Sequence, residues 1–185
     1  LGGFSESRKI VLPIMAAVLI VSPGVTRPGL ASEINTKVSA ALEKLYEKSE
    51  TARVMGEKAK GILVFPEIVK GGFIVGGQYG EGVLLIDGKP GGNYSTVQVS
   101  YGFQAGLQKY GYALFLMTDS ALEWLDRSGG WELGVGPTIV VVDAGAAKAL
   151  TTTTARSEIY AFFFDQKGLM GGLGLQGTKI TRMNK

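Results

Sequence analysis

Apolar residues recur at three- and four-residue spacing between positions 34 and 45, with charged residues between them. The apolar positions are Ile34, Val38, Ala41, Leu42 and Leu45. This spacing predicts an amphipathic α-helix, and Ser32 stands where an N-cap is expected. Such a helix either packs its apolar face on a sheet or lies on a membrane surface, and we expect the packing arrangement.

A shorter helix is predicted in the second half of the chain, over residues 119–128. Ser120 and Glu123 have the spacing of a capping box. Gly129 and Gly130 follow as a stop signal. The pattern therefore predicts one short helix between two strand regions.

From residue 61 the pattern changes from helical spacing to that of strands. Apolar runs and alternating segments, separated by Gly, Pro, Asn and Asp, predict β-strands. The predicted strands cover residues 62–65, 74–85, 95–108, 112–117, 131–143, 158–165 and 169–183. Pro66 is expected to end the first strand, residues 87–93 to form a hairpin or loop, and residues 166–168 to form a turn.

Glycine is frequent inside these predicted strands. Six of the twelve residues from Gly71 to Gly82 are glycine. Glycine weakens a strand interior, so its repeated use marks bulges, bends and places where another group approaches the backbone closely. We expect an α+β fold: a small, strongly curved, mostly antiparallel glycine-rich sheet or barrel-like core, with the N-terminal amphipathic helix and the helix near 119–128.

One glycine run matches a nucleotide-binding pattern by spacing alone. Gly172, Gly174 and Gly177 satisfy G-x-G-x-x-G. That fingerprint requires a helix after the glycines and an acidic residue about 20 positions further on. Here strand-like residues continue to Ile180, and we expect no dinucleotide site.

Composition removes several kinds of chemistry. The 185 residues include no Cys and no His, which excludes nucleophile relays that use them and zinc sites built from them. Asp119, Glu123 and Asp126 share one predicted helix and are expected to form a solvated face. Glu81, between two glycines, is an isolated acid. We predict no catalytic residues, no cofactor and no metal site, and therefore no enzyme.

The first 31 residues have the pattern of an export signal. Arg8 and Lys9 precede an unbroken apolar run over residues 10–21, and Ala31 follows a cleavage-site pattern of small residues. An uncleaved membrane anchor and a buried helix are the alternatives. We expect a signal peptide over residues 1–31 and a single domain over residues 32–185.

The net charge of +3 comes mostly from that first segment. Residues 32–185 hold 16 basic and 15 acidic residues. A nearly neutral domain lacks the basic stripe that nucleic-acid binding requires, so we expect no nucleic-acid partner.

Several blocks of the sequence resemble the SYLF domain family. These blocks are "KGILVFPEIVKGGFIVGGQYGEGVLL", "SYGFQAGLQKYGYALFLMTDSALEWL", "WELGVGPTIVVVDAG" and "KGLMGGLGLQGTKI". The resemblance covers residues 34–185. It implies a non-enzymatic module that binds membrane lipids, phosphoinositides in eukaryotic members, some of which regulate actin. Bacterial members are usually exported, many as lipoproteins.

The resemblance also implies which residues meet the lipid. Family lipid binding involves the amphipathic N-terminal segment and basic surface, which correspond here by position to Lys37, Lys44, Lys48, Arg53, Lys58 and Lys60. The expected function is that of a lipid-associating domain, for anionic phospholipids or phosphoinositides, in an exported periplasmic or envelope-associated protein. Without Cys, the sequence as given is not a Cys-acylated lipoprotein. The alternative is a structural or protein-interaction module at the envelope.

Overall fold

Three helices and eight strands make up the part of the chain that the structure describes. The computed structural model describes residues 28–72, 75–101, 106–127, 130–133, 135–142, 157–168, 175 and 177–184. The helices are α1 (Pro28–Lys48), α2 (Glu50–Gly56) and α3 (Asp119–Leu125). The strands are β1 (Gly61–Gly72), β2 (Val75–Ile86), β3 (Lys89–Tyr101), β4 (Gly106–Leu116), β5 (Trp131–Glu132), β6 (Ile139–Val142), β7 (Ile159–Gly168) and β8 (Lys179–Arg182).

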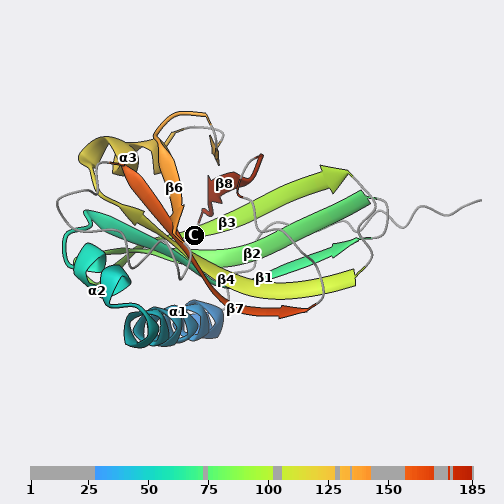
Figure 1. Cartoon of the computed structure of the whole chain (residues 1–185), viewed down its shortest axis with the longest axis horizontal. Helices are drawn as coiled ribbons and strands as arrows, with labels where there is room; N and C mark the ends of the chain where they lie inside the picture. The colour runs from blue at the N-terminus through green and yellow to red at the C-terminus, as the bar shows by residue number, and fades with distance from the viewer. Residues whose placement is uncertain are drawn as a thin grey trace, which may run out of the picture.

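All eight strands belong to one curled sheet, a half-barrel with the order β5-β8-β3-β2-β1-β4-β7-β6. Every described pairing is antiparallel except that of β6 with β7. Figure 1 shows β1 to β4 as long, twisted arms that reach well beyond the helices. The expected α+β fold with a strongly curved, mostly antiparallel sheet is confirmed.

The sheet buries apolar side chains on both of its faces. On the inner face, Trp131 and Ile180 from one edge share a core with Ile159 from the other, which is possible because the sheet curls. On the outer face, Val38 and Leu45 of α1 belong to the core that covers the sheet. Successive residues of the central strands therefore point alternately into the inner and the outer core. Because both faces are covered here, residues 61–65 are all buried, with no exposed position between them.

The helix α1 packs its apolar face on the sheet, as expected for the amphipathic segment over residues 34–45. Val38 is 0% and Leu45 is 5% exposed. The helix begins at Pro28, so Ser32 lies within it and is not the N-cap, and the backbone carbonyl of Ser32 accepts from Thr36 Oγ1. The expected domain boundary after Ala31 falls inside this helix.

Other local predictions were wrong about where elements begin and end. Thr118, not Ser120, caps α3, because the Thr118 hydroxyl accepts from Ala121 N at 3.1 Å. The hairpin or loop expected over residues 87–93 is a hairpin, although its turn is confined to Asp87-Gly88, both with positive φ, and β3 begins at Lys89. Residues 166–168 continue β7, and the single strand expected over 131–143 is split into β5 and β6.

Pro66 does not end β1, which runs on to Gly72. Instead, the pairing of β1 with β2 shifts register between Val64 and Glu67. The pairing of β1 with β4 shifts at the same place, between Phe65 and Ile68. Pro66 is tolerated because the strand bulges here, and a bulge does not require every ladder hydrogen bond.

Glycines face this bulge from both neighbouring strands. A Cβ at Gly82 of β2 would overlap the Val64 carbonyl and would lie 2.6 Å from Phe65 Cδ1. A Cβ at Gly111 of β4 would overlap the Phe164 ring. The bulge and these glycines form a crease, defined by residues 65–67, 80–82, 110–111 and 165–166, that crosses β1, β2, β4 and β7. The glycines at the crease are thus explained by close packing at a bend, as predicted, whereas a Cβ at Gly71 or Gly77 would make only ordinary contacts, at 3.5 Å or more.

Some expectations concern residues outside the described ranges. Among these are residues 1–27 of the signal segment expected over 1–31, and residues 169–174 and 176 of the strand expected over 169–183, which include Gly172 and Gly174. Gly177 is described and has a φ of +73°. No helix in the described ranges combines the length and apolarity that a membrane crossing requires.

The crease makes a prediction about stability. Gly82→Ala should lower the free energy of unfolding by about 1–3 kcal/mol, because the new methyl group overlaps the β1 backbone. Gly77→Ala is the matched control on the same strand, since a Cβ there meets only Gln98 O, at 3.8 Å. Urea denaturation of both variants measures the difference, and equal stabilities would show that the crease does not require a bare backbone.

Candidate binding surfaces

The six predicted lipid-binding side chains lie on and after the helices that cover the outer face. Lys37, Lys44 and Lys48 belong to α1, Arg53 belongs to α2, and the remaining two lie between α2 and β1. They are exposed, but the apolar face of α1 is turned toward the sheet. Inserting that face into a membrane would require the helix to leave the core.

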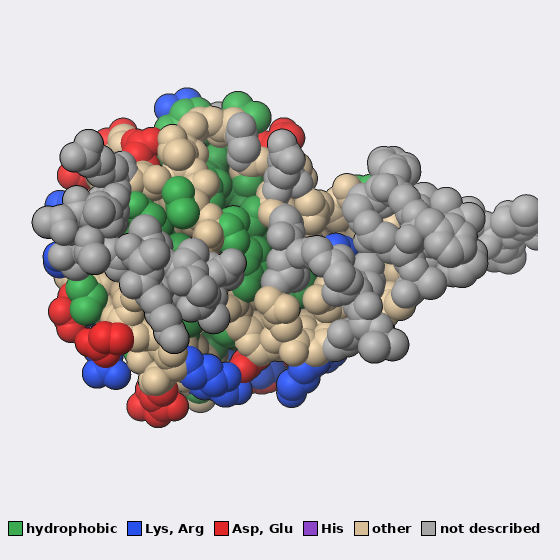
Figure 2. All heavy atoms as spheres, in the orientation of Figure 1, with side chains coloured by type: hydrophobic (Ala, Val, Ile, Leu, Met, Phe, Trp, Pro, Cys, Tyr) green, Lys and Arg blue, Asp and Glu red, His purple; other side chains and the backbone are tan. Residues whose placement is uncertain are grey.

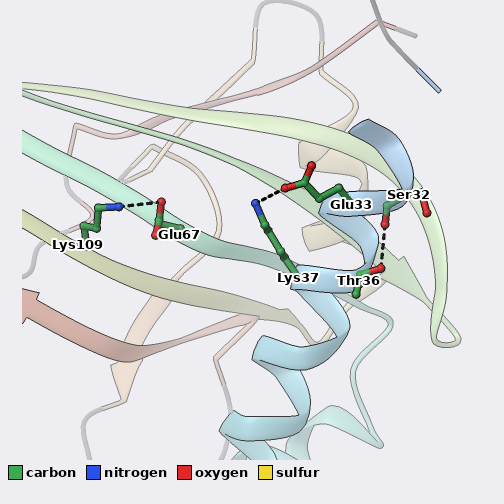
Figure 3. Close-up of polar contacts among 6 residues, drawn as sticks. All are labelled: Ser32, Glu33, Thr36, Lys37, Glu67 and Lys109. Carbon is green, nitrogen blue, oxygen red and sulfur yellow. Dashed lines mark hydrogen bonds and ion pairs between the residues drawn. The ribbon is translucent and has the colours of Figure 1, made fainter. Parts of the chain in front are cut away.

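Five of the six side chains form ion pairs. The pairs are Lys37–Glu33 at 2.6 Å, Lys44–Asp165 at 2.7 Å, Lys48–Asp165 at 3.3 Å, Arg53–Glu50 at 3.4 Å and Lys60–Asp119 at 3.7 Å. Figure 3 shows Lys37 turned toward Glu33, near Glu67 and Lys109 of the sheet. Within the described residues, Lys58 forms no ion pair. The basic residues that cluster in the sequence are therefore largely neutralised in space, and their lipid-binding role stays a prediction.

Asp165 joins the helix to the crease. It has a φ of +51° at the register shift between β4 and β7, which directs its carboxylate toward Lys44 and Lys48 of α1. The hydrogen bond from Lys44, assisted by Lys48, lowers the pKa of Asp165, while partial burial opposes this shift. Lys44 and Lys48 thus link α1 to the sheet through ion pairs with Asp165.

A surface of exposed apolar side chains lies on the outer face, beyond α1. Cross-strand pairing places Val69, Tyr79 and Val97 in one row on β1, β2 and β3. The next row holds Leu107 and Val99, with Gly71 and Gly77 between them. The exposed fractions are 38% for Val69, 50% for Tyr79, 43% for Val97, 59% for Val99 and 61% for Leu107. We name these five residues the outer apolar patch.

Charges of both signs border the outer apolar patch. Lys109 and Lys179 flank the Val69 row, and the exposed Lys167 of β7 lies beyond Lys109. Glu67 and Glu81 lie in the row next to it, toward the crease, and Glu67 pairs with Lys109 at 3.3 Å. On the face of the molecule drawn in Figure 2, basic and acidic side chains also mix along the lower edge, where α1 lies. The surface is therefore apolar with a nearly neutral border.

The inner face carries polar side chains that sequence reasoning did not single out. Tyr110 donates to Gln78 Oε1 at 2.6 Å, and Tyr112 donates to Thr96 Oγ1 at 2.8 Å. Burial raises the pKa of Tyr110 to about 12, although the hydrogen bond to Gln78 opposes this shift. Both hydroxyls thus stay neutral donors. The only sequence feature that could have identified these residues is that they alternate along each strand with residues of the outer face.

The acidic candidates do not converge on a site. Asp119 pairs with Lys60, and Asp126 pairs with Arg182 and accepts from Tyr94. Glu81 accepts from Tyr79 at 2.7 Å on the open outer face. Within the described ranges, no group of three acidic side chains could hold a metal ion. These carboxylates have structural partners and form no acid–base pair.

Comparison with known proteins identifies a family for the second half of the chain. Residues 97–185 match the family model Ysc84, described as "Las17-binding protein actin regulator". This is the SYLF family that the sequence blocks resemble, so the resemblance is confirmed over residues 97–185. It is a family of binding domains. A search of curated proteins found no match to the chain.

The Asp165 ion pairs make stability depend on pH. The folded-state pKa of Asp165 lies below the ordinary value of 3.8, so its contribution is complete above about pH 5 and is lost as the pH falls through the folded-state pKa. Asp165→Asn should therefore lower the free energy of unfolding at pH 7, by less than about 1 kcal/mol, and have a smaller effect at about pH 2. Asn is chosen because it also tolerates a positive φ.

Urea denaturation of Asp165→Asn at both pH values measures this difference. Glu47→Gln is the control, because Glu47 is an exposed acid on α1 without an ion pair among the described residues. A loss of stability that is the same at both pH values would contradict the electrostatic account.

Proposed function

We propose that this chain is a non-enzymatic, lipid-associating domain of an exported cell-envelope protein, and that the outer apolar patch is its membrane-facing surface. The observation that carries this proposal is the position of the patch. Five apolar side chains lie exposed on one face of β1 to β4, on the part of the sheet that extends beyond α1. Contiguous exposed apolar surface of this kind is typical of interaction and membrane sites.

The geometry of the outer apolar patch suits a flat partner better than a small ligand. Its side chains stand on adjacent strands, which lie about 4.8 Å apart, and two glycines lie level between Leu107 and Val99. Tyr79 combines a ring with a hydroxyl, the combination that is favoured at membrane–water interfaces. A bilayer surface can accept all five side chains at once without a groove.

The border charges determine how such binding depends on salt. Lys109 and Lys179 can meet lipid phosphates, but Glu67 and Glu81 offset them, so burial of apolar surface provides most of the affinity. The predicted set of six basic residues adds a secondary attraction to anionic lipids. Each unpaired lysine near the surface contributes about 1 kcal/mol, and an acidic partner cancels most of this.

The patch is tested by placing charge within it. Val99→Asp combined with Leu107→Asp should weaken co-sedimentation with phospholipid vesicles at least about tenfold, because burying two carboxylates opposes insertion. Val141→Asp is the matched control, since Val141 is 46% exposed on β6 at the other edge of the sheet. Absence of vesicle binding by the unchanged protein, or equal binding by the double variant, would refute the proposed surface.

The basic residues are tested separately with anionic vesicles at two salt concentrations. Lys58→Gln should weaken binding more than Lys44→Gln, because Lys58 is exposed and lacks an ion pair among the described residues, whereas Lys44 is paired with Asp165. Binding of the unchanged protein should fall only modestly at high salt. Equal binding of both variants at low salt would remove the lysines from the proposal.

A protein partner is the second candidate for the same surface. The description of the matching family, "Las17-binding protein actin regulator", favours it. A partner protein would bury the outer apolar patch as effectively as a bilayer does. Indifference to every vesicle composition, together with self-association that the Val99→Asp and Leu107→Asp changes abolish, would favour the structural or protein-interaction role.

A further inference from the structure

Four polar side chains form a single row across the inner face of the sheet. Gln108 of β4 lies opposite Lys70 of β1, Lys70 lies opposite Gln78 of β2, and Gln78 lies opposite Gln98 of β3. Directly opposite residues of antiparallel strands point to the same face, so these side chains are neighbours. We name these four residues the inner polar row. They alternate along each strand with residues of the outer face, among them Val69 and Tyr79 of the outer apolar patch.

Three of the four residues of the row are buried, and one of the three is a lysine. Lys70 is 8%, Gln78 is 4% and Gln108 is 3% exposed. None of the ion pairs within the described ranges involves Lys70. Beside the lysine the row contains only neutral amides, so no anion among the described residues compensates the charge of Lys70.

The row also contains an acceptor without a donor. Gln108 Oε1 is buried and has no hydrogen-bond partner. By contrast, Gln78 Oε1 accepts from Tyr110, and Gln78 Nε2 donates to Thr178 at 3.5 Å. These bonds fix the amide on one side of Lys70, while the amide on the other side retains an unused oxygen. Leaving such an atom unpaired is unfavourable unless a ligand supplies the donor.

We infer that the inner polar row binds a phosphate group, with Lys70 donating to an anionic oxygen and Gln108 Oε1 accepting from a phosphate hydroxyl. A hydrogen phosphate or phosphomonoester monoanion presents both kinds of group on one atom centre. A carboxylate or a sulfate near neutral pH presents acceptors alone and leaves Gln108 Oε1 unpaired. The same chemistry is available from free phosphate and from a lipid phosphomonoester headgroup.

Isothermal titration calorimetry of the full chain at pH 7, at low ionic strength, tests this site with sodium phosphate and sodium sulfate. Phosphate should bind at least about tenfold more tightly than sulfate. Lys70→Met should weaken phosphate binding at least about tenfold and keep the fold, because it replaces a buried charge with an apolar chain. Gln108→Leu should remove the preference for phosphate over sulfate.

Lys89→Met is the control, since Lys89 is an exposed lysine at the start of β3 and belongs to neither proposed surface. Thermal melting checks that each variant is folded, and Lys70→Gln replaces Lys70→Met if the latter is not. Absence of phosphate binding by the unchanged protein, equal binding of sulfate, or undiminished binding by a folded Lys70 variant would each overturn the inference.

Vesicles distinguish the two sources of the phosphate group. Phosphatidic acid carries a phosphomonoester, whereas phosphatidylcholine does not. If the site takes the lipid headgroup, Lys70→Met should lose the preference for phosphatidic acid vesicles, and free phosphate should compete with them. If it takes free phosphate, the same variant should lose only the calorimetric signal. The Val99→Asp and Leu107→Asp variant should keep phosphate binding, so failure of the proposed membrane surface leaves this site testable.

Discussion

Close contact between the bulge in β1 and the glycines beside it is the constraint on which the rest of the fold depends. A side chain at Gly82 or Gly111 would occupy space already taken by Val64, Phe65 or Phe164. The bare backbone lets three neighbouring strands change register at the same level, so the sheet bends and does not extend flat. Curling brings both edges of the sheet to one inner core.

The crease also divides the sheet into two parts that differ in how they are covered. On one side of it, both faces are covered, by α1 and α2 outside and by the shared core inside. On the other side, no helix among the described residues lies over the outer face of β1 to β4 (Figure 1). Alternation along these arms then places apolar residues on the outer face and amides with Lys70 on the inner face. Both proposed binding surfaces follow from this single arrangement.

Ion pairs in the fold make the basic residues near the start of the chain less available to an anionic partner than the sequence suggests. In the sequence they form a cluster, which suggests an anionic partner. In the fold, Asp165 approaches Lys44 and Lys48 from a strand more than one hundred residues away, and three further acids pair with Lys37, Arg53 and Lys60. Lys44 and Lys48 link α1 to β7, whereas the pairs of Lys37 and Arg53 lie within single helices. Because most of these charges are paired, the proposed association with a membrane rests more on apolar contact than on charge.

The sequence by itself determined the fold class, the amphipathic helix and the reason for the glycines, because periodicity and local steric cost are properties of neighbouring residues. The family resemblance was also readable from it and is confirmed over residues 97–185. The local sequence pattern wrongly predicted helix caps at Ser32 and Ser120 and the end of β1 at Pro66. Cap hydrogen bonds and strand bulges depend on residues in other segments, which a local pattern does not contain.

Only the tertiary structure decided which polar residues meet. Lys70, Gln78, Gln98 and Gln108 are separated in the sequence and become one row through strand register, as do the members of the outer apolar patch. Register depends on long-range pairing across the sheet, which no local pattern specifies.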